Sequence, residues 1–450
     1  MNIYTMENKE RQYFFDGDRL LFNISNKVIN DILDLLNEGK TKEEIFEKLK
    51  DKHTAEDLKE AFEVIEEYFN IESSTIGINY DVDIDKWKKK KRVQHLWLNI
   101  SNDCNLRCIY CYGSGGSYGR TRNLMTQETA KKCIDYWYTN LDEETKDSYV
   151  CFFGGEPFMN KKIFIYCVNY INELLKDRDI NIHYMVTTNG TILDEDYKKV
   201  IKENDFAITI SMDGGKEITK INRPQVNGES SYYKIKENLP GFLEIAGNVT
   251  ARVTLTGNNV DKLNSIIEEL SDLGFTSIHY ELASVESEEL SVTEEKLKRL
   301  FVEIDKAADV TYEAIHGRGN RVLDNLTNMI RCLHNRSIGG NCSFYADNVL
   351  MFGSEGQIFK CHRLSVHDEY VFGNVDTGLD ISRYLNLENK KKLTKCSKCI
   401  AKKICNGGCA HINLTYNDST TDPYEPYCEN IRYLLKVALK MYSNLQIENS

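Results

Sequence analysis

The sequence predicts an α/β protein built around a partial (β/α)6 barrel, with a small helical module before the barrel and a cysteine-rich domain after it. Three observations support this fold class: short apolar strands alternate with amphipathic stretches in the middle of the chain, a hairpin and three helical patterns precede them, and cysteines cluster near the C-terminus. With 450 residues, of which 41% are apolar, the chain can bury more than one core.

Residues 1–80 are predicted to form a module of their own. Segments 12–15 and 19–24 flank Asp16-Gly17-Asp18, a sequence typical of a tight hairpin turn. Three helical patterns follow, and the second begins with a capping-box pattern at Thr41 and Glu44. A hairpin with three helices resembles a winged-helix module. Residues 1–70 carry a net charge of −7, which argues against DNA binding by that shape.

A basic segment at 81–92 is predicted to be an interdomain linker, and residues 93–310 are predicted to form the TIM-type barrel. Because strand and helix patterns alternate, the sheet should be parallel, with its chemistry at the carboxyl ends of the strands. Residues 311–340 are assigned to a helical bridge, and 341–450 to the cysteine-rich domain, with a hairpin at 349–356. The expected barrel strands are 95–100, 149–153, 182–187, 207–212, 249–256 and 277–282.

Composition excludes several classes of partner. The chain has 57 basic and 69 acidic residues, a net charge of −12, so we expect no nucleic acid partner. No apolar run approaches the roughly 18 residues that cross a bilayer, so we expect no membrane partner and a cytoplasmic location. In a reducing compartment, 14 cysteines that fall in clusters indicate metal binding rather than disulfides.

The first cysteine cluster follows the first barrel strand. Cys104, Cys108 and Cys111 have spacings that allow three thiolates to hold three irons of a 4Fe–4S cluster and leave the fourth iron open. Zinc is the competing metal, but a closed structural zinc site needs four ligands, and no His or Cys follows within about twenty residues.

This pattern, with Tyr110 before the third cysteine, resembles the signature of the radical S-adenosylmethionine (SAM) superfamily. Residues Gly154, Gly155, Glu156 and Pro157 are similar to that family's GGEP segment, in which paired glycines let the backbone approach a ligand and the carboxylate can accept a hydrogen bond from an ammonium. The resemblance implies that the three cysteines are catalytic ligands and that a flavodoxin or ferredoxin supplies a low-potential electron. It also implies contacts of Ser211 and Asp213 with ribose hydroxyls, and of Thr188 and Arg252 with the SAM carboxylate.

A second cysteine pattern resembles the SPASM extension of radical SAM enzymes. It comprises Cys342, Cys361, Cys396, Cys399, Cys405, Cys409 and Cys428. The resemblance implies two further 4Fe–4S clusters, three in all. By analogy, Cys342, Cys361 and Cys409 hold the first auxiliary cluster, and Cys396, Cys399, Cys405 and Cys428 hold the second. Either Cys332 completes the first set, or one iron of that cluster stays open for a substrate thiolate. We favour the open iron.

The remaining cysteines and the nearby histidines have simpler interpretations. Cys133, Cys151 and Cys167 lie in apolar patterns, so we expect them in the core. His279, His362 and His411 come close to the predicted chemistry in sequence, but a single histidine is more often structural.

The N-terminal module resembles the precursor-recognition domain of enzymes that mature ribosomally made peptides, in which a leader peptide adds as a strand to the hairpin edge. Together the three parts resemble maturases that join a Cys sulfur to a carbon, and residues 111–119 look like those acting on six-cysteine precursors. The implied hypothesis is that a substrate Cys binds the open auxiliary iron as a thiolate. The 5′-deoxyadenosyl radical then abstracts hydrogen from an acceptor residue such as Thr, and the resulting carbon radical attacks the Cys sulfur. Alternatives are a carbon–carbon crosslinking maturase, a sulfatase-type maturase, a multi-cluster electron carrier and a zinc-binding interaction protein.

Overall fold

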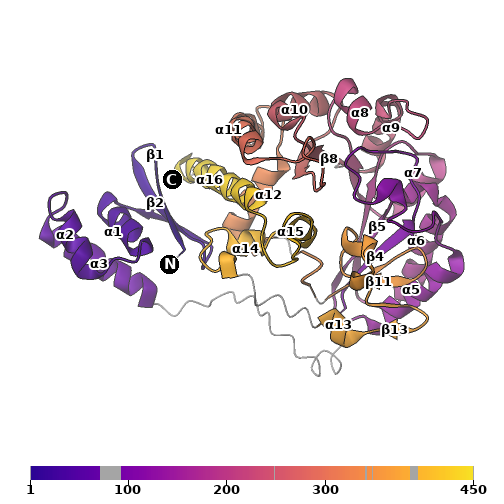
Figure 1. The fold of residues 1–450 in the computed structure, drawn as a ribbon, viewed down its shortest axis with the longest axis horizontal. Coiled ribbons are helices and arrows are strands. Elements are labelled where there is room, and N and C mark those ends of the chain that lie inside the picture. Colours follow the sequence, from indigo (N-terminus) through magenta and orange to yellow (C-terminus); the bar gives the residue numbers. More distant parts are fainter. Residues whose placement is uncertain are drawn as a thin grey trace.

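The computed structural model describes residues 2–70, 93–247, 249–339, 342–346, 348–385 and 394–448. The predicted linker at 81–92 and the end of the predicted module at 71–80 lie outside these residues. Figure 1 shows the N-terminal module at one end of the molecule, the barrel at the other, and the long C-terminal helix between them.

The N-terminal module contains the predicted hairpin and all three predicted helices. Its antiparallel sheet has the order β1 (Ile3–Asn8), β2 (Arg11–Asp16), β3 (Leu21–Ser25), and its helices are α1 (Lys27–Asn37), α2 (Lys42–Leu49) and α3 (Ala55–Asn70). The capping box of α2 is confirmed. Strand β1 is not in the sequence prediction, because three of its six residues are polar and its pairing with β2 makes it a strand. A separate core forms between the sheet and the helices.

The central sheet confirms the predicted α/β barrel. Six parallel strands follow one another in chain order: β4 (His95–Ser101), β5 (Asp147–Gly154), β6 (Asn181–Thr188), β7 (Ala207–Ser211), β8 (Val249–Leu255) and β9 (Ser277–Leu282). The intervening helices are α5 (Gln127–Asn140), α6 (Lys161–Leu175), α7 (Glu195–Glu203), α8 (Lys216–Asn222), α9 (Tyr232–Ile245) and α10 (Leu263–Asp272). Successive residues of a strand point alternately into the barrel and toward the surrounding helices. This alternation determines which side chains can reach a ligand inside the barrel.

The C-terminal region extends this sheet. Strand β10 (Val349–Phe352) pairs in parallel with β4, and β11 (Gln357–Phe359), β12 (Gly373–Asn374) and β13 (Gly378–Leu379) continue it as an antiparallel edge. The predicted hairpin at 349–356 is therefore present. Its pairing with β4 was not predicted, and it brings the turn after β11, which contains Cys361, beside the barrel.

Helices complete the C-terminal half. They are α11 (Glu294–Ile315), α12 (Asp324–Asn335), α13 (Ile381–Leu385), α14 (Lys402–Cys405), α15 (Ala410–Asn417) and α16 (Glu425–Glu448). The predicted boundary at 310/311 falls inside α11, because one amphipathic pattern runs across it and packs on α16, where the Phe301 and Tyr433 rings stack at 4.0 Å. In the part of the chain that the structure describes, no helix combines the length and apolar character needed to span a bilayer.

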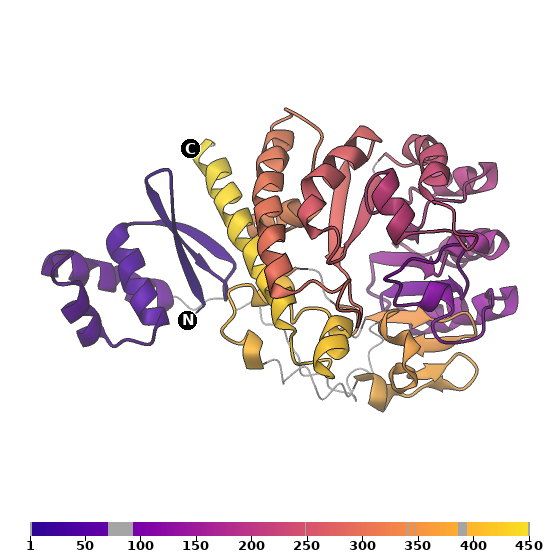
Figure 2. The ribbon, with the colours of Figure 1, turned by 45° about the horizontal axis from the view of Figure 1, so that its top comes forward.

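The module packs against α16 and against the cysteine loop at 396–405 (Figures 1 and 2). Asn8 Nδ2 donates a hydrogen bond to Ser443 Oγ at 2.7 Å, which ties β1 to α16. Asn2 Nδ2 donates to the backbone oxygen of Ser397 at 3.0 Å, which ties the start of the module to the loop. The fold thus places the module directly beside one set of candidate metal ligands.

Candidate active site

The first cysteine loop, residues 104–111, begins just after β4. All three of its cysteines line one cavity of about 360 Å³. The Leu106 N–H donates to Cys104 Sγ at 3.4 Å, and the Gly115 N–H donates to Cys111 Sγ at 3.3 Å. Burial, together with the nearby Glu156, raises the pKa of Cys104 to about 12, so a bound metal ion is needed to make this sulfur a thiolate at neutral pH.

Two glycines bring the end of β5 against the first cysteine loop. A side-chain carbon on Gly155 would lie 2.3 Å from the Asp103 carbonyl oxygen and 2.6 Å from the Cα atom of Gly116. The Gly155 N–H also donates to the Ser101 carbonyl oxygen at 2.8 Å. Only glycine fits here, and the exposed backbone of this segment forms part of the cavity wall.

Glu156 is buried behind that wall. Its carboxylate accepts hydrogen bonds from Thr188 Oγ1 at 2.7 Å, from the Asn189 N–H at 2.7 Å and from the Phe158 N–H at 3.0 Å. Burial raises the pKa of Glu156 to about 7, although these hydrogen bonds act in the opposite direction. In this structure Glu156 therefore ties the GGEP segment to the end of β6.

Asp213 is also buried and does not line the cavity. It accepts hydrogen bonds from the Tyr110 hydroxyl at 2.5 Å and from the Thr254 N–H at 2.9 Å, and Arg223 Nη1 in turn donates to the Tyr110 hydroxyl at 2.5 Å. Asp213 thus anchors Tyr110 and Arg223 in the cavity wall. Ser211, two residues earlier, faces the cavity.

Six of the nine predicted cofactor residues therefore reach the cavity and three do not. Those that line it are Tyr110, Gly154, Gly155, Thr188, Ser211 and Arg252. Those that do not are Glu156, Pro157 and Asp213. Pro157 begins a short 3₁₀ turn at Pro157–Met159, where its fixed φ suits the first helical position.

The turn after β11 also lines the cavity. His362 packs on Phe153 with ring centroids 4.2 Å apart, and Arg363 extends between two cysteine-bearing segments. Arg363 Nη1 donates to Cys409 Sγ at 3.8 Å, and the guanidinium lies 5.6 Å from the Tyr112 ring centroid. One cavity consequently extends from the first cysteine loop to residues in contact with the C-terminal cysteines.

The C-terminal cysteines lie as two groups. In the first auxiliary group (Cys342, Cys361 and Cys409), burial and the two neighbouring thiols raise the pKa of Cys361 to about 12. In the second auxiliary group (Cys396, Cys399, Cys405 and Cys428), burial and the other three thiols raise the pKa of Cys405 to about 12. The members of each group are therefore neighbours, in the same grouping that the SPASM resemblance implies.

Cys332 lies on α12 and is not among the main neighbours that shift the pKa of Cys342 or Cys361. The choice between Cys332 and an open iron stays a prediction. Cys133 and Cys167 are fully buried in α5 and α6, as expected of core residues. Cys151 is buried on β5 as well, but it also lines the cavity.

The donor set fits the cofactors that the motifs imply. Cysteine sulfur is the ligand that iron–sulfur clusters take, and in the first cysteine loop backbone N–H groups donate to the sulfurs of Cys104 and Cys111. The adjoining cavity, with glycine backbone, a hydroxyl and arginines in its wall, has the size and polarity of a small-molecule cofactor site. Among the described residues, no three Cys, His, Asp or Glu side chains converge closely enough to chelate a single metal ion.

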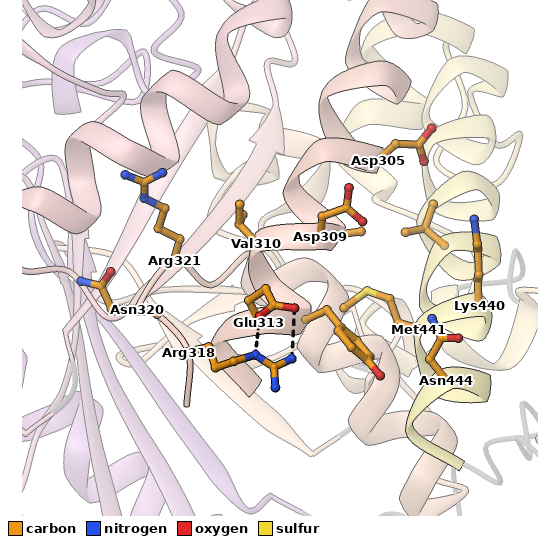
Figure 3. A pocket seen from close by; sticks show the side chains of 14 residues that line it. Asp305, Asp309, Val310, Glu313, Arg318, Asn320, Arg321, Lys440, Met441 and Asn444 are labelled. Atoms are coloured by element: carbon orange, nitrogen blue, oxygen red, sulfur yellow. Dashed lines mark hydrogen bonds and ion pairs between the residues drawn. The ribbon is translucent and has the colours of Figure 1, made fainter. Parts of the chain in front are cut away.

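A larger cavity of about 830 Å³ lies elsewhere, between α11, α16 and the loop at 318–321 (Figure 3). Its charged side chains include Asp309 and Lys440, and a Glu313–Arg318 ion pair lines it. No cysteine lines it. Because its residues offer no ligand chemistry comparable to that of the smaller cavity, we do not assign it the reaction.

Sequence reasoning missed several residues of the smaller cavity. Tyr112, Arg223, Glu281 and Arg363 all line it, and His362, which was interpreted as structural, does too. A signal existed for Glu281, because a charged residue within the apolar strand pattern IHYEL must face the barrel interior. Arg223 and Arg363 lie in loops whose place depends on the tertiary fold.

Comparison with known proteins relates this chain to a family and to several individual proteins. Residues 98–270 match the sequence profile of the Radical SAM superfamily. An uncharacterised protein of Methanocaldococcus jannaschii is 33% identical over 199 residues, which are 44% of this chain and 65% of that protein. The cysteine-type anaerobic sulfatase-maturating enzyme of Clostridium perfringens strain 13 is 24% identical over 378 residues, covering 77% of this chain and 96% of that enzyme.

Two solved structures share the fold. Native anSMEcpe with bound AdoMet has a TM-score of 0.66 at 20% identity, covering 79% of this chain and 100% of that one. Streptococcus suis SuiB bound to S-adenosylmethionine has a TM-score of 0.50 at 14% identity, covering 93% of this chain and 97% of that one. At such identities the likeness concerns the fold alone.

Proposed function

Because residues 98–270 match the sequence model of the Radical SAM superfamily, we propose that this chain is a radical SAM peptide maturase that joins a Cys sulfur to a carbon of another residue in a ribosomally made, cysteine-rich precursor. The chain is a radical SAM enzyme that uses SAM and a 4Fe–4S cluster. The observation that carries the finer proposal is the single cavity that extends from the first cysteine loop to Arg363, whose guanidinium contacts Cys409 of the first auxiliary group.

The residues of the chain have distinct tasks in this proposal. Cys104, Cys108 and Cys111 would hold the cluster that cleaves SAM, and the two auxiliary groups would hold one 4Fe–4S cluster each. When bound, the cluster and SAM supply the one-electron chemistry and the 5′-deoxyadenosyl radical that side chains alone cannot provide. The glycine backbone, Ser211 and Arg252 would bind and orient SAM, and the aromatic wall formed by Phe153, His362 and Tyr112 would exclude water from the reacting atoms.

A groove on the N-terminal module supports the proposal that the substrate is a peptide. It has a volume of about 180 Å³ and lies between β3 and α3. Ile24 on β3 is 69% exposed and Val64 on α3 is 53% exposed, so apolar surface is open on both sides of it. Strand β3 pairs with β2 on one side only, and its other edge has no partner strand among the described residues. A leader peptide could add to this edge and place apolar side chains along α3.

The test is anaerobic incubation of the reconstituted enzyme with SAM, a reductant and the cysteine-rich peptide encoded nearest to it. We expect about twelve irons per chain if three 4Fe–4S clusters are present, and loss of two hydrogens from the peptide for each crosslink by mass spectrometry. Fragmentation should then locate the sulfur–carbon bond. An unchanged peptide mass, with 5′-deoxyadenosine still formed, would contradict the proposal.

A matched pair of substitutions tests the groove. Val64→Glu places a charge in the groove. Val302→Glu places the same charge on α11, at a position where the valine is 55% exposed and thus similar to Val64. We expect the first variant to lose peptide modification by at least about tenfold while it still cleaves SAM, because a buried charge in the groove opposes leader binding. The second variant should resemble the wild type.

A sulfatase-type maturase is the second candidate, favoured by the alignment with the Clostridium perfringens enzyme over 77% of this chain. Such an enzyme would not need the module. Deletion of residues 1–80 should therefore leave activity on a sulfatase-derived Cys peptide intact if this candidate is right, and should abolish modification of the cysteine-rich precursor if the first is right.

A further inference from the structure

Glu281, near the end of β9, lies between two arginines of the cavity. Its Oε1 is 3.3 Å from Arg252 Nη2, and its Oε2 is 3.7 Å from Arg363 Nη2. All three side chains line the cavity. One carboxylate thus joins an arginine of the barrel to an arginine of the C-terminal region.

A second layer of charge holds Glu281 in turn. His279, on the same face of β9, lies with Nε2 3.4 Å from Glu281 Oε1 and Nδ1 3.1 Å from Asp324 Oδ2, at the start of α12. Burial alone would raise the pKa of Glu281, but Arg252, His279 and Arg363 together hold it well below its usual range. The carboxylate is therefore ionised, and it lies between the Arg252 and Arg363 guanidinium groups and beside His279.

The two arginines face different partners. Arg252 pairs with Ser211 in the β7–β8 register, so it belongs to the part of the cavity where SAM is expected. Arg363 contacts Cys409 and the Tyr112 ring, so it belongs to the part beside the first auxiliary group. Without an anion between them, two guanidinium groups in one buried site would repel each other and turn away.

We propose that Glu281 is a positioning residue, which holds Arg252 toward SAM and Arg363 toward the first auxiliary group and so couples SAM cleavage to modification of the substrate. The coupling to substrate modification rests on the proposed function, whereas the positioning of Arg252 does not. That positioning concerns SAM binding and stands without the peptide.

Glu281→Gln tests the proposal because it keeps the shape and removes the charge. We expect the KM for SAM, measured from 5′-deoxyadenosine formation without peptide, to rise about tenfold, with kcat changed by less than about twofold. With peptide present, the ratio of 5′-deoxyadenosine to crosslinked product should rise at least about fivefold, since the two arginines no longer act together.

Glu303→Gln is the matched control. Glu303 is a buried carboxylate of α11 that accepts hydrogen bonds from Asn264 and pairs with Lys306, outside the cavity. If Glu281→Gln changes the KM for SAM and the product ratio no more than Glu303→Gln does, at equal iron content, Glu281 is only structural and the proposal is overturned. If the wild type fails to modify any peptide, the thioether proposal fails, while the KM comparison still decides the role of Glu281.

Discussion

The first cysteine loop and the cysteine loop at 396–405 have the same ligand chemistry in different surroundings. The first packs against glycine backbone, and its cysteines line the cavity. The second packs against the Asp16–Asp18 turn of the N-terminal module, where Lys402 pairs with Asp18 and none of its cysteines is among the cavity-lining residues. Cysteine spacing predicts a cluster in both places, and the surroundings predict different tasks for them: chemistry beside the cavity, and support of the docked module at the second loop.

Loss of one ligand in each loop should separate these two tasks most strongly. Cys108→Ala should lower 5′-deoxyadenosine formation by at least about 10³-fold, because no side chain supplies the one-electron chemistry by itself. Cys399→Ala should remove about four irons per chain and leave SAM cleavage within about tenfold of the wild type. Hydrogen exchange in the module, at residues 11–25, should rise in the Cys399 variant alone.

Iron content, 5′-deoxyadenosine formation and hydrogen exchange would be measured on the same preparations. An equal loss of SAM cleavage in both variants would show that the second loop takes part in the chemistry, which contradicts the comparison.

A pair of glycines gives a smaller and more local test. A side-chain carbon on Gly155 would lie 2.3 Å from the Asp103 carbonyl oxygen, and one on Gly17 would lie 2.3 Å from the Ile400 carbonyl oxygen. Relieving such a clash costs about 1–3 kcal/mol. Gly155→Ala should raise the KM for SAM about tenfold or more, and Gly17→Ala should leave that KM unchanged but lower peptide modification about tenfold.

Gly247→Ala is the control for both variants, because nothing lies within 4 Å of the added carbon. Kinetics with and without peptide distinguish the two effects. A Gly17 variant that modifies peptide as fast as the Gly247 variant would show that tight docking of the module has no role in catalysis.

The sequence predicted what is local and missed what the fold brings together. The six strands and the first cysteine loop follow from apolar runs and fixed spacings, so they could be read from the chain. Arg252 and Glu281 meet because β8 pairs with β9, and Arg363 joins them only because β10 pairs with β4 and carries the turn after β11 to the barrel. Strand β1 was missed for a similar reason, since its partner β2 rather than its own pattern makes it a strand.

Two carboxylates, the buried Glu156 and the partly exposed Asp18, sharpen the comparison further, because their pKa values move in opposite directions. Burial raises the pKa of Glu156 to about 7, and no cation pairs with it among the described contacts. Burial would raise the pKa of Asp18 too, but hydrogen bonds from Lys402 and Asn2 and the nearby charge of Lys403 hold it below its usual range. The two groups should therefore give opposite pH dependence to their regions.

The sign follows from linkage. Since the folded pKa of Glu156 is above its unfolded value, its contribution to stability is complete below about pH 4.5 and is lost as the pH rises through about 7, at most roughly 3 kcal/mol. Since the folded pKa of Asp18 is lowered, its contribution is present above about pH 4 and is lost as the pH falls. Between pH 5 and 8, the melting temperature of the wild type should fall relative to that of Glu156→Gln and stay parallel to that of Asp18→Asn. Parallel curves for Glu156→Gln would mean that the carboxylate behind the cavity wall is already ionised at pH 5, and that its three hydrogen-bond donors outweigh its burial.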